Sequence, residues 1–391
     1  MKIIYFSAHP QLNLSDRSGY ATHMNGMIRA FGKKGHEVLP IIAGGAVEGL
    51  GAKRDKKNNL KGWAKAVIPT YFWESIKDYN LLKKNIGALA DLTKGIKEFN
   101  PDLIYERACY LSFEGIKAAN DLGVKHILEV NAPLVEEKDV LESRSYFYGG
   151  ALKTERSQLG STSRIVVVSE ILQDYFLKKY DLPQSKFIVT PNAVDPSRIE
   201  FSQQRQEEII AEYRLESKTV IGFVGSFFKW HGLSMLISAF KSLETEFSNL
   251  ALFIVGDGEE SKELQLLAGD SLNNSIHFTG NVAPEEVSDY INIIHIATMP
   301  ASNWYGSPMK IFEYGSLGRA IIAPDEAPLK EVMEHNVDGL LIKPAAESLK
   351  QALRELINND QKRIELGKNF QKKVLDLHTW NHNVDAVLEG F

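Results

Sequence analysis

Between residues 301 and 322 the chain combines a turn, a lysine and a glutamate at spacings that could bind a phosphorylated ligand. The apolar runs His295–Pro300 and Ala320–Pro324 read as buried parallel strands, and a Gly-Ser-Pro turn between them leads into a short helix. Pro308 suits the first turn of that helix, because its fixed φ matches the helix and its missing N–H would have no partner there. We therefore expect a strand–turn–helix unit whose helix start faces a ligand.

The first turn of this helix offers groups for a phosphate and for a ribose. The backbone N–H groups of Met309, Lys310 and Ile311 would point outward toward an anion, and the Lys310 side chain adds a cation. Glu313, one turn further, can accept two hydrogen bonds from a vicinal diol. Phosphate with ribose indicates a nucleotide, although an ordinary strand–turn–helix with a solvated Glu313 also fits this pattern.

The composition is typical of a folded protein with two domains. The 391 residues are 44% hydrophobic and 24% charged, and the net charge of −5 argues against general nucleic-acid binding. Cys109 is the single cysteine, so no intramolecular disulfide can form, and no Cys/His spacing indicates a zinc site. The N-terminus has no signal-peptide core and no apolar run approaches the roughly 18 residues of a membrane span. We expect a cytoplasmic protein.

Short apolar runs alternate with helical patterns along most of the chain, which predicts parallel sheets covered on both faces. The polar stretch around residues 197–218 breaks the alternation and reads as a linker. The predicted strands before it are Lys2–Ala8, Glu37–Ala43, Asp102–Glu106, Lys125–Val130, Arg164–Ser169 and Phe187–Thr190. Those after it are Val220–Gly225, Ala251–Gly256, Ile276–Gly280, His295–Pro300 and Ala320–Pro324.

The two halves therefore predict two doubly wound α/β domains facing a cleft. Residues 1–196 form the first, 219–375 form the second, and an amphipathic helix in 376–391 is expected to pack back on the first. Several strands of the second half end in glycine-bearing turns, at Gly225, at Gly256–Gly258 and at Gly280. Ligands of open parallel sheets bind beyond the carboxyl ends of the strands, where such turns gather.

The order and spacing of nine short motifs make the chain similar to a known family. The motifs are Ser18–Tyr20, Lys34–Val38, Val167–Ser169, Thr190–Asp195, Gly225–Ser226 with Trp230–Gly232, Val255–Gly258, Phe278–Val282, Ser307–Tyr314 and Trp380. With these motifs the chain resembles retaining glycosyltransferases of the GT-B class, family 4, which have two Rossmann-like domains.

The resemblance implies that the second domain binds a nucleotide-activated sugar. Glu313 would hold the ribose, Lys310 and the Ser307–Ile311 backbone would lie near the diphosphate, and the Gly280–Val282 turn would contact the base. Gly19, in the first domain, would approach the diphosphate closely, where a glycine leaves room for an anion. The implied donor-binding set is Ser18, Gly19, Gly225, Ser226, Lys229, His231, Asp257, Gly258, Asn281, Val282, Tyr305, Gly306, Ser307, Pro308, Met309, Ile311 and Glu313.

The chain departs from the family pattern at three donor positions. Tyr305 stands where relatives often have a second glutamate, and Ser226 stands where many have an arginine. His231 replaces a lysine that usually precedes the glycine matching Gly232. Lys229 could supply the diphosphate cation instead; alternatively, Lys229 is solvated and His231 packs against the turn.

The reacting-sugar side also departs from the pattern. Many relatives have a histidine at the end of the strand matching Lys125–Val130, where this chain has Glu129 and Asn131. Glu129 could accept a proton and Asn131 could form hydrogen bonds, but Glu129 could equally form a structural ion pair. With Lys310, these are the candidate catalytic residues. Retention, with the leaving phosphate accepting the nucleophile's proton, would need no protein base.

No metal or other cofactor is expected, because the sequence has no Asp-x-Asp and the resembling family does not use one. Helix N-termini and lysines would then stabilise the departing diphosphate.

The expected acceptor is a glycan or a lipid-linked molecule. Between Gly51 and Lys65 the chain has six basic residues against Asp55 alone, and Trp63, Tyr71, Phe72 and Trp73 lie close by. Cations with interfacial aromatics suit an anionic lipid surface, so segment 51–73 is a candidate for peripheral contact with the inner face of the membrane. A solvated loop explains the same residues without a function.

Other functional classes stay open at this stage. A sugar-nucleotide epimerase of the same architecture would need carboxylate acid/base groups and no acceptor. A binding subunit that lost its chemistry is consistent with Tyr305 and the missing histidine. A dinucleotide oxidoreductase is disfavoured, because no Gly-x-Gly-x-x-Gly follows the first strand.

Overall fold

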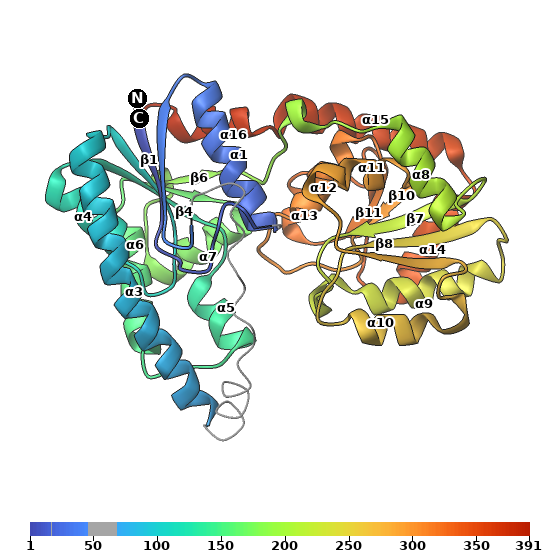
Figure 1. The fold of residues 1–391 in the computed structure, drawn as a ribbon, viewed down its shortest axis with the longest axis horizontal. Helices are drawn as coiled ribbons and strands as arrows, with labels where there is room; N and C mark the ends of the chain where they lie inside the picture. The colour runs from blue at the N-terminus through green and yellow to red at the C-terminus, as the bar shows by residue number, and fades with distance from the viewer. Residues whose placement is uncertain (17, 46–68) are drawn as a thin grey trace. The chain divides into compact units, whose positions relative to one another are not determined.

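The computed structural model describes residues 1–16, 18–45 and 69–391, which form two compact units (Figure 1). Unit 1 consists of Met1–Thr190 together with Asn383–Phe391, and unit 2 is the continuous segment Pro191–His382. The chain therefore passes between the units twice, after residue 190 and inside the helix α16 (Trp380–Leu388).

Within the described residues, unit 1 has a parallel six-stranded sheet in the order β2-β1-β3-β4-β5-β6. Its strands are β1 (Lys2–Ser7), β2 (Glu37–Ile42), β3 (Leu103–Arg107), β4 (Lys125–Val130), β5 (Arg164–Val167) and β6 (Phe187–Val189). Its helices are α1 (Gly19–Lys33), α3 (Thr70–Phe99), α4 (Glu114–Leu122), α5 (Leu134–Leu141), α6 (Tyr148–Ser161), α7 (Glu170–Tyr180) and the 3-10 turn η1 (Gln184–Lys186). Side chains of α3 and α4 pack on Ile4, Phe6 and Ile104 in one apolar core.

Unit 2, all of whose residues are described, has a parallel six-stranded sheet in the order β12-β11-β10-β7-β8-β9. Its strands are β7 (Thr219–Val224), β8 (Leu250–Val255), β9 (Ile276–Gly280), β10 (Ile296–Thr298), β11 (Ala320–Pro324) and β12 (Leu340–Ile342). Its α-helices are α8 (Gln203–Tyr213), α9 (Leu233–Glu244), α10 (Ser261–Ala268), α11 (Val287–Asn292), α12 (Met309–Ser316), α13 (Ala327–Lys330), α14 (Ala346–Ile357) and α15 (Asp360–Leu377). The 3-10 turns are η2 (Pro196–Arg198), η3 (Lys229–His231), η4 (Gly269–Ser271) and η5 (Pro284–Glu286).

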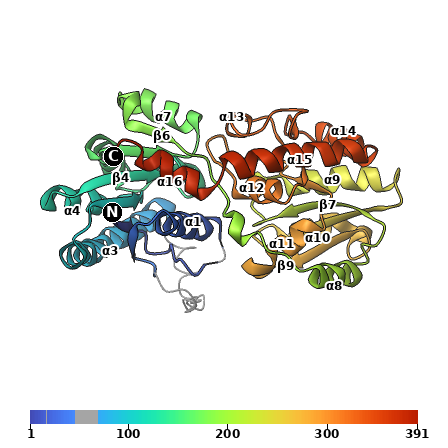
Figure 2. The same cartoon turned by 90° about the horizontal axis from the view of Figure 1, so that it is seen from above.

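Alternating side chains of β7 show why helices cover both faces of this sheet. Ile221 and Phe223 belong to a core with α9, α10 and α14, whereas Val220 and Val224 belong to a second core with α8, α11, α12 and α15. Figure 1 shows α9, α10 and α14 on one side of the sheet and α11, α12 and α15 on the other, and Figure 2 shows the same elements turned by 90°. A parallel strand buried on both faces is apolar at every position, which is the pattern that the sequence shows.

The strands predicted from sequence are all present, with ends that shift slightly, but two features differ from the prediction. The short strand β12 was missed, because three apolar residues give little signal. The stretch 197–218, predicted as the linker, contains helix α8, and the boundary between units lies at residues 190–191 instead. Ile209 is fully buried in the core of unit 2, so this polar helix packs through a narrow apolar stripe.

The last nine residues belong to unit 1, where two contacts hold them. Arg164 Nη1 donates to the carbonyl oxygen of Val387 at 2.5 Å, and Lys34 pairs with Asp385 at 2.6 Å.

Cys109 is buried in unit 1, and burial raises the pKa of its thiol. Among the described helices, none combines the length and the apolar character that crossing a membrane requires.

Candidate functional site

The glycine turns predicted at strand ends in unit 2 lie together at the carboxyl edge of its sheet. Gly225 follows β7 and Gly256 follows β8, with φ angles of +140° and +126°. A Cβ on Gly256 would lie 2.1 Å from the carbonyl oxygen of Gly225, and one on Gly258 would lie 2.5 Å from the backbone nitrogen of Phe227. The two turns therefore pack backbone against backbone, which only glycine permits.

Two asparagines hold the turn that leads into α12. Asn303 Oδ1 accepts from the N–H of Gly306 at 2.7 Å. The N–H of Asn192 donates to Ser307 Oγ at 2.9 Å, and its side-chain amide donates to the carbonyl oxygen of Ser307. The sequence analysis assigns no separate role to Asn192, which lies in the Thr190–Asp195 motif. The available signal was a polar residue in the loop that follows β6.

Helix α12 is anchored to the end of β7. The N–H of Val224 donates to the hydroxyl of the buried Tyr314 at 2.7 Å. Pro308 is the N-cap residue rather than part of the first turn, and no side chain caps this helix start. The N–H of Ile311 donates to the carbonyl oxygen of Pro308 at 3.3 Å. Of the three amides predicted to bind an anion, Ile311's is thus already used within the turn.

The two charged residues predicted on α12 lie at this edge, in a setting that is largely shielded from water. Lys310 is 8% exposed; its Nζ lies 4.2 Å from the centre of the Phe223 ring and 3.2 Å from Nε2 of His231. Burial lowers the pKa of Lys310 to about 7, although the charge of Glu313 acts to raise it. Glu313 is half-buried; burial raises its pKa, and Lys310 partly offsets the increase. Both groups would bind a ligand more strongly here than in water.

The other predicted donor residues differ in exposure. Asp257 is exposed, and its carboxylate accepts from Ser261 Oγ and from the N–H of Gly258, which lowers the pKa of Asp257. This carboxylate stabilises its own turn. Ser226, Lys229, Gly258 and Asn281 are also exposed, Val282, Gly306 and Met309 are half-buried, and Tyr305 and Ser307 are buried.

The structure brings Lys310 to His231, whereas the sequence suggests Lys229 as the substitute for the family lysine that His231 replaces. Lys229 lies two residues before His231 in the same 3-10 turn and is exposed to solvent. His231 Nδ1 lies 2.6 Å from the carbonyl oxygen of Ser226. His231 therefore does more than pack against the turn, because it contacts both the β7 turn and α12.

In unit 1, the predicted donor residues Ser18 and Gly19 begin helix α1. Ser18 is the N-cap residue, and its Oγ accepts from the N–H of Ala21 at 3.4 Å. Gly19 is the first residue of the helix. Both therefore lie at a helix N-terminus, where backbone N–H groups and the helix dipole favour an anion.

Glu129, a candidate base, is 1% exposed at the carboxyl end of β4 and its two oxygens contact four side chains. Oε2 lies 3.0 Å from His23 Nε2 and accepts from the Tyr105 hydroxyl at 2.7 Å. Oε1 accepts from Arg107 at 2.8 Å and from the Asn131 amide at 2.5 Å. Burial alone would raise the pKa of Glu129, but these partners, His23 foremost, hold it at about 2.

A carboxylate with such a low pKa is a weak base near neutral pH. The geometry therefore favours the ion-pair alternative for Glu129, and Asn131 serves here as one of its donors. The prediction did not identify His23 and Arg107. The available signals were a histidine on the buried face of α1 and an arginine that ends an apolar strand.

We predict that Glu129→Gln lowers the free energy of unfolding by about 3 kcal/mol at pH 7, because it leaves the half-buried guanidinium of Arg107 without its carboxylate partner. The folded-state pKa is lower than the unfolded one, so the ion pair stabilises the fold above about pH 4.5, and this contribution fades as the pH falls toward 2. Urea unfolding at pH 7 and pH 3 should show the gap to wild type narrowing in acid. Glu98→Gln, on the exposed surface of α3, is the matched control. Unchanged stability with lost turnover would instead indicate a catalytic Glu129.

Comparison with known proteins gives matches along the whole chain. The family model described as glycosyl transferases group 1 matches residues 205–373, and the model described as Glycosyltransferase Family 4 matches residues 17–198. An uncharacterised glycosyltransferase of Haemophilus influenzae is 25% identical over 386 residues, which are 97% of this chain and 96% of that protein. The O-antigen chain mannosyltransferase C of Escherichia coli is 26% identical over 218 residues, 54% of this chain and 55% of that protein. The lipopolysaccharide 1,2-N-acetylglucosaminetransferase of Salmonella typhimurium is 23% identical over 233 residues, 56% of this chain and 59% of that protein.

Solved structures match the fold of the whole chain. The structure of HepE from Anabaena in complex with UDP has a TM-score of 0.73 at 16% identity and covers 100% of both chains. WaaG, a glycosyltransferase involved in lipopolysaccharide biosynthesis, has a TM-score of 0.70 at 16% identity, again over 100% of both chains. The predicted fold of two Rossmann-like domains is thereby confirmed. With both halves matched by glycosyltransferase models, the chain belongs to the family 4, group 1 glycosyltransferases of the GT-B class.

Proposed function

We propose that this glycosyltransferase moves a sugar from a UDP- or GDP-linked donor to a glycan, glycolipid or other glycoconjugate acceptor, with retention of the anomeric configuration. The observation that carries the proposal is the pair of Lys310 and Glu313, held one turn apart on α12 beside the glycine turns of β7 and β8. Relatives named for O-antigen and lipopolysaccharide synthesis support the acceptor class. A structural neighbour determined with UDP and with UDP-glucose supports the donor class.

In this proposal each group at the edge of unit 2 has one task. Glu313 accepts two hydrogen bonds from the ribose diol, and Lys310 with the free end of α12 receives the diphosphate. The Asn281–Val282 turn after β9 contacts the base. The diphosphate role of Ser18 and Gly19 rests on the family resemblance alone.

The chemical step then depends on stabilising the leaving diphosphate. As the glycosidic bond to phosphate breaks, negative charge grows on the phosphate oxygen, and a fixed ammonium in a low-dielectric site stabilises that charge. The same oxygen takes the proton of the acceptor hydroxyl on the face where the new bond forms, which retains the configuration. This route needs no protein base, in agreement with the low pKa of Glu129.

We expect Glu313→Ala to raise the KM for the donor, or lower turnover, at least tenfold while the fold stays intact. It removes two charge-assisted hydrogen bonds to the ribose, each worth roughly 1.5–3 kcal/mol. Initial rates with a panel of UDP- and GDP-sugars, with and without acceptors, provide the measurement. Glu347→Ala, on an exposed face of α14, is the control. Wild-type kinetics in the Glu313 variant would rule out the ribose role, and a panel without turnover would favour a binding subunit.

We also propose that Lys310 and the α12 N-terminus, rather than a metal ion, meet the charge of the leaving diphosphate. Turnover should then persist in excess EDTA, whereas Lys310→Ala should lose at least tenfold in turnover with or without added Mn²⁺. Complete loss of activity in EDTA that Mn²⁺ or Mg²⁺ restores would contradict this proposal.

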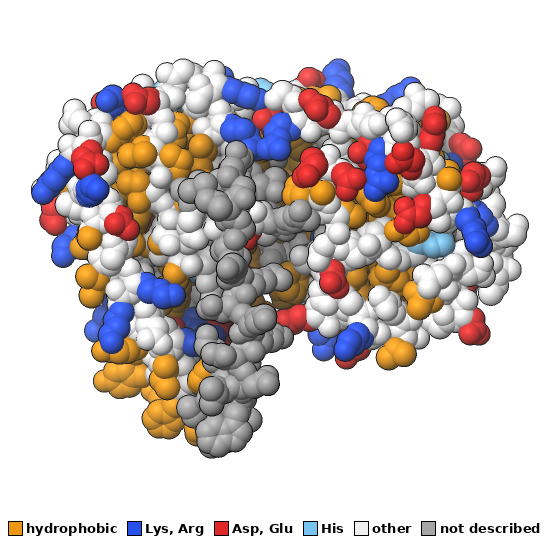
Figure 3. Space-filling view, viewed as in Figure 1, with side chains coloured by type: hydrophobic (Ala, Val, Ile, Leu, Met, Phe, Trp, Pro, Cys, Tyr) orange, Lys and Arg blue, Asp and Glu red, His pale blue; other side chains and the backbone are white. Residues whose placement is uncertain are grey.

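The third part of the proposal is contact with an anionic membrane near the start of α3. The basic residues of segment 51–73 lie outside the described residues, but Tyr71 and Phe72 are described and are 44% and 60% exposed. Phe72, Ile76 and Tyr79 share one face of α3 by their spacing, and all three are exposed. Figure 3 shows hydrophobic side chains gathered over this end of the helix. Val140 and Leu141, at the end of α5, and Tyr146, which comes after this helix, are exposed as well.

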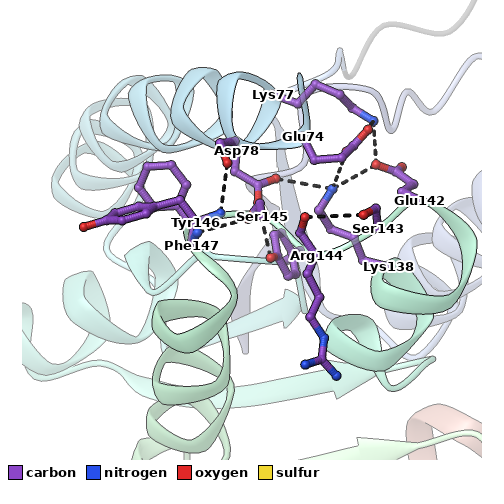
Figure 4. A network of polar contacts seen from close by, with 12 residues as sticks. Glu74, Lys77, Asp78, Lys138, Glu142, Ser143, Arg144, Ser145, Tyr146 and Phe147 are labelled. Atoms are coloured by element: carbon purple, nitrogen blue, oxygen red, sulfur yellow. Dashed lines mark hydrogen bonds and ion pairs between the residues drawn. The ribbon is translucent and has the colours of Figure 1, made fainter. Parts of the chain in front are cut away.

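A network of charged side chains fixes this surface in place (Figure 4). Lys138 Nζ on α5 lies 2.9 Å from Glu74 and 3.4 Å from Asp78, both on α3, and 2.8 Å from Glu142. The Ser145 hydroxyl donates to Asp78 at 2.5 Å. Because Glu74 and Asp78 point into the network, the opposite face of the helix start presents its apolar side chains to solvent.

The double variant Phe72→Ser with Ile76→Ser should reduce binding to vesicles that contain anionic lipid, yet spare donor hydrolysis in solution. Removing two apolar side chains removes the hydrophobic part of the attraction to the membrane. Salt should weaken the remaining electrostatic attraction to anionic lipid. Cosedimentation with anionic and neutral vesicles tests this, and Leu266→Ser, at an even more exposed apolar site on α10, is the control. Equal sedimentation of wild type with both vesicle types would favour a soluble acceptor.

A further inference from the structure

His231 lies between the β7 turn and Lys310, and its two ring nitrogens have partners of opposite kind. Nδ1 is 2.6 Å from the carbonyl oxygen of Ser226, which can only accept a hydrogen bond. Nε2 is 3.2 Å from the ammonium of Lys310, which can only donate. These partners determine the tautomer: the proton is on Nδ1, and Nε2 accepts from Lys310. The ring is therefore neutral while it bridges the two.

The alternative charged state is disfavoured by the surroundings of the ring. A protonated imidazole would place a second cation next to Lys310, and burial together with that charge lowers the pKa of His231 to about 3. The ring centre lies 5.5 Å from that of Phe223, 6.0 Å from Phe228 and 5.9 Å from Trp230. These three aromatic rings orient the imidazole and shield it from water.

Lys310 has little freedom to adopt another position. Its Nζ lies over the Phe223 ring, and a Cβ on Gly225 would lie 3.1 Å from its Cε and 3.2 Å from its Nζ. The aliphatic chain thus uses the space that glycine leaves at the β7 turn. His231 is neutral, and the charge that acts on Lys310 is that of Glu313, on the same helix. Without an acceptor at position 231, this long side chain would lose the contact that directs its ammonium.

We propose that His231 is a positioning residue, whose neutral Nε2 holds the Lys310 ammonium over the Gly225 turn so that it meets the donor diphosphate. This inference rests on the proposed function and adds a residue that positions the lysine of the donor site. The residues at 226 and 231 are a serine and a histidine, so in this proposal the buried Lys310, aimed by His231, supplies the charge at the turn. A hydrogen bond to the charged form also favours the protonated state of Lys310.

The test measures binding of UDP and of GDP by calorimetry at pH 6 and pH 8. Wild type should bind more weakly at pH 8, because Lys310, whose pKa is about 7, loses its proton as the pH rises. His231→Phe keeps the ring but removes the acceptor, so we expect at least a tenfold loss of affinity at pH 8 and a smaller loss at pH 6. His231→Gln, whose amide oxygen can accept from Lys310, should recover part of the loss. Comparing variants at one pH cancels the titration of the ligand itself.

A double-mutant cycle distinguishes positioning from a general structural effect. In a Lys310→Ala background, His231→Phe should change the affinity less than twofold, because the group that it aims is gone. His277→Phe, at a buried histidine on β9, is the control and should bind as wild type does.

Three outcomes would overturn the inference. If His231→Phe binds as wild type does at both pH values while Lys310→Ala is weak, His231 does not position the lysine and the donor site stands. If the affinity losses of His231→Phe and Lys310→Ala simply add in the double variant, His231 likewise does not act through Lys310. If wild type binds neither UDP nor GDP, the donor-site assignment fails and the inference fails with it. Thermal unfolding of each variant verifies that the fold is intact.

Discussion

The arrangement of unit 2 depends on a lysine charge held in a largely dry site. An ammonium that leaves water without compensation destabilises a fold, and the lowered pKa of Lys310 reflects that cost. The surroundings offset it in several ways: the Phe223 ring lies under the ammonium, Nε2 of His231 accepts from it, and Glu313 contributes an opposite charge. The missing side chain at Gly225 leaves the space. In the proposed function a bound diphosphate would complete the compensation, so the fold keeps a site that suits an anion at some expense of stability.

Much of the fold could be predicted from the sequence, because its signals are local. A strand buried on both faces is a short apolar run, and such runs identified eleven strands of the two sheets within a residue or two. The placement of Lys310 and Glu313 on one helix could equally be predicted. Turn, helix start and charge all fall within a few residues of one another, so spacing alone places them on the same side of α12.

What escaped prediction depends on residues that are distant in the sequence. His231 meets Lys310 across 79 positions, and Arg107 meets Glu129 across 22, so neither spacing indicates a contact. Asn192 and Ser307 are 115 positions apart. Helix α8 was read as a linker because its apolar stripe is narrow, and only packing against α11 shows that Ile209 is buried. Local patterns indicate which elements form, whereas the partners of polar side chains follow from how those elements pack.

The division of unit 1 into two chain segments has a consequence for how the protein is made. Residues 383–391 contribute the Val387 carbonyl to Arg164 and the Asp385 carboxylate to Lys34, yet all of unit 2 is synthesised before them. Unit 2 is continuous, so its core needs no residue from beyond position 382. Unit 1 lacks these two contacts until residues 383–391 have been synthesised. The nascent chain therefore completes unit 1 only after all of unit 2 has been translated, and a chain that stops before residue 383 would leave unit 1 without them.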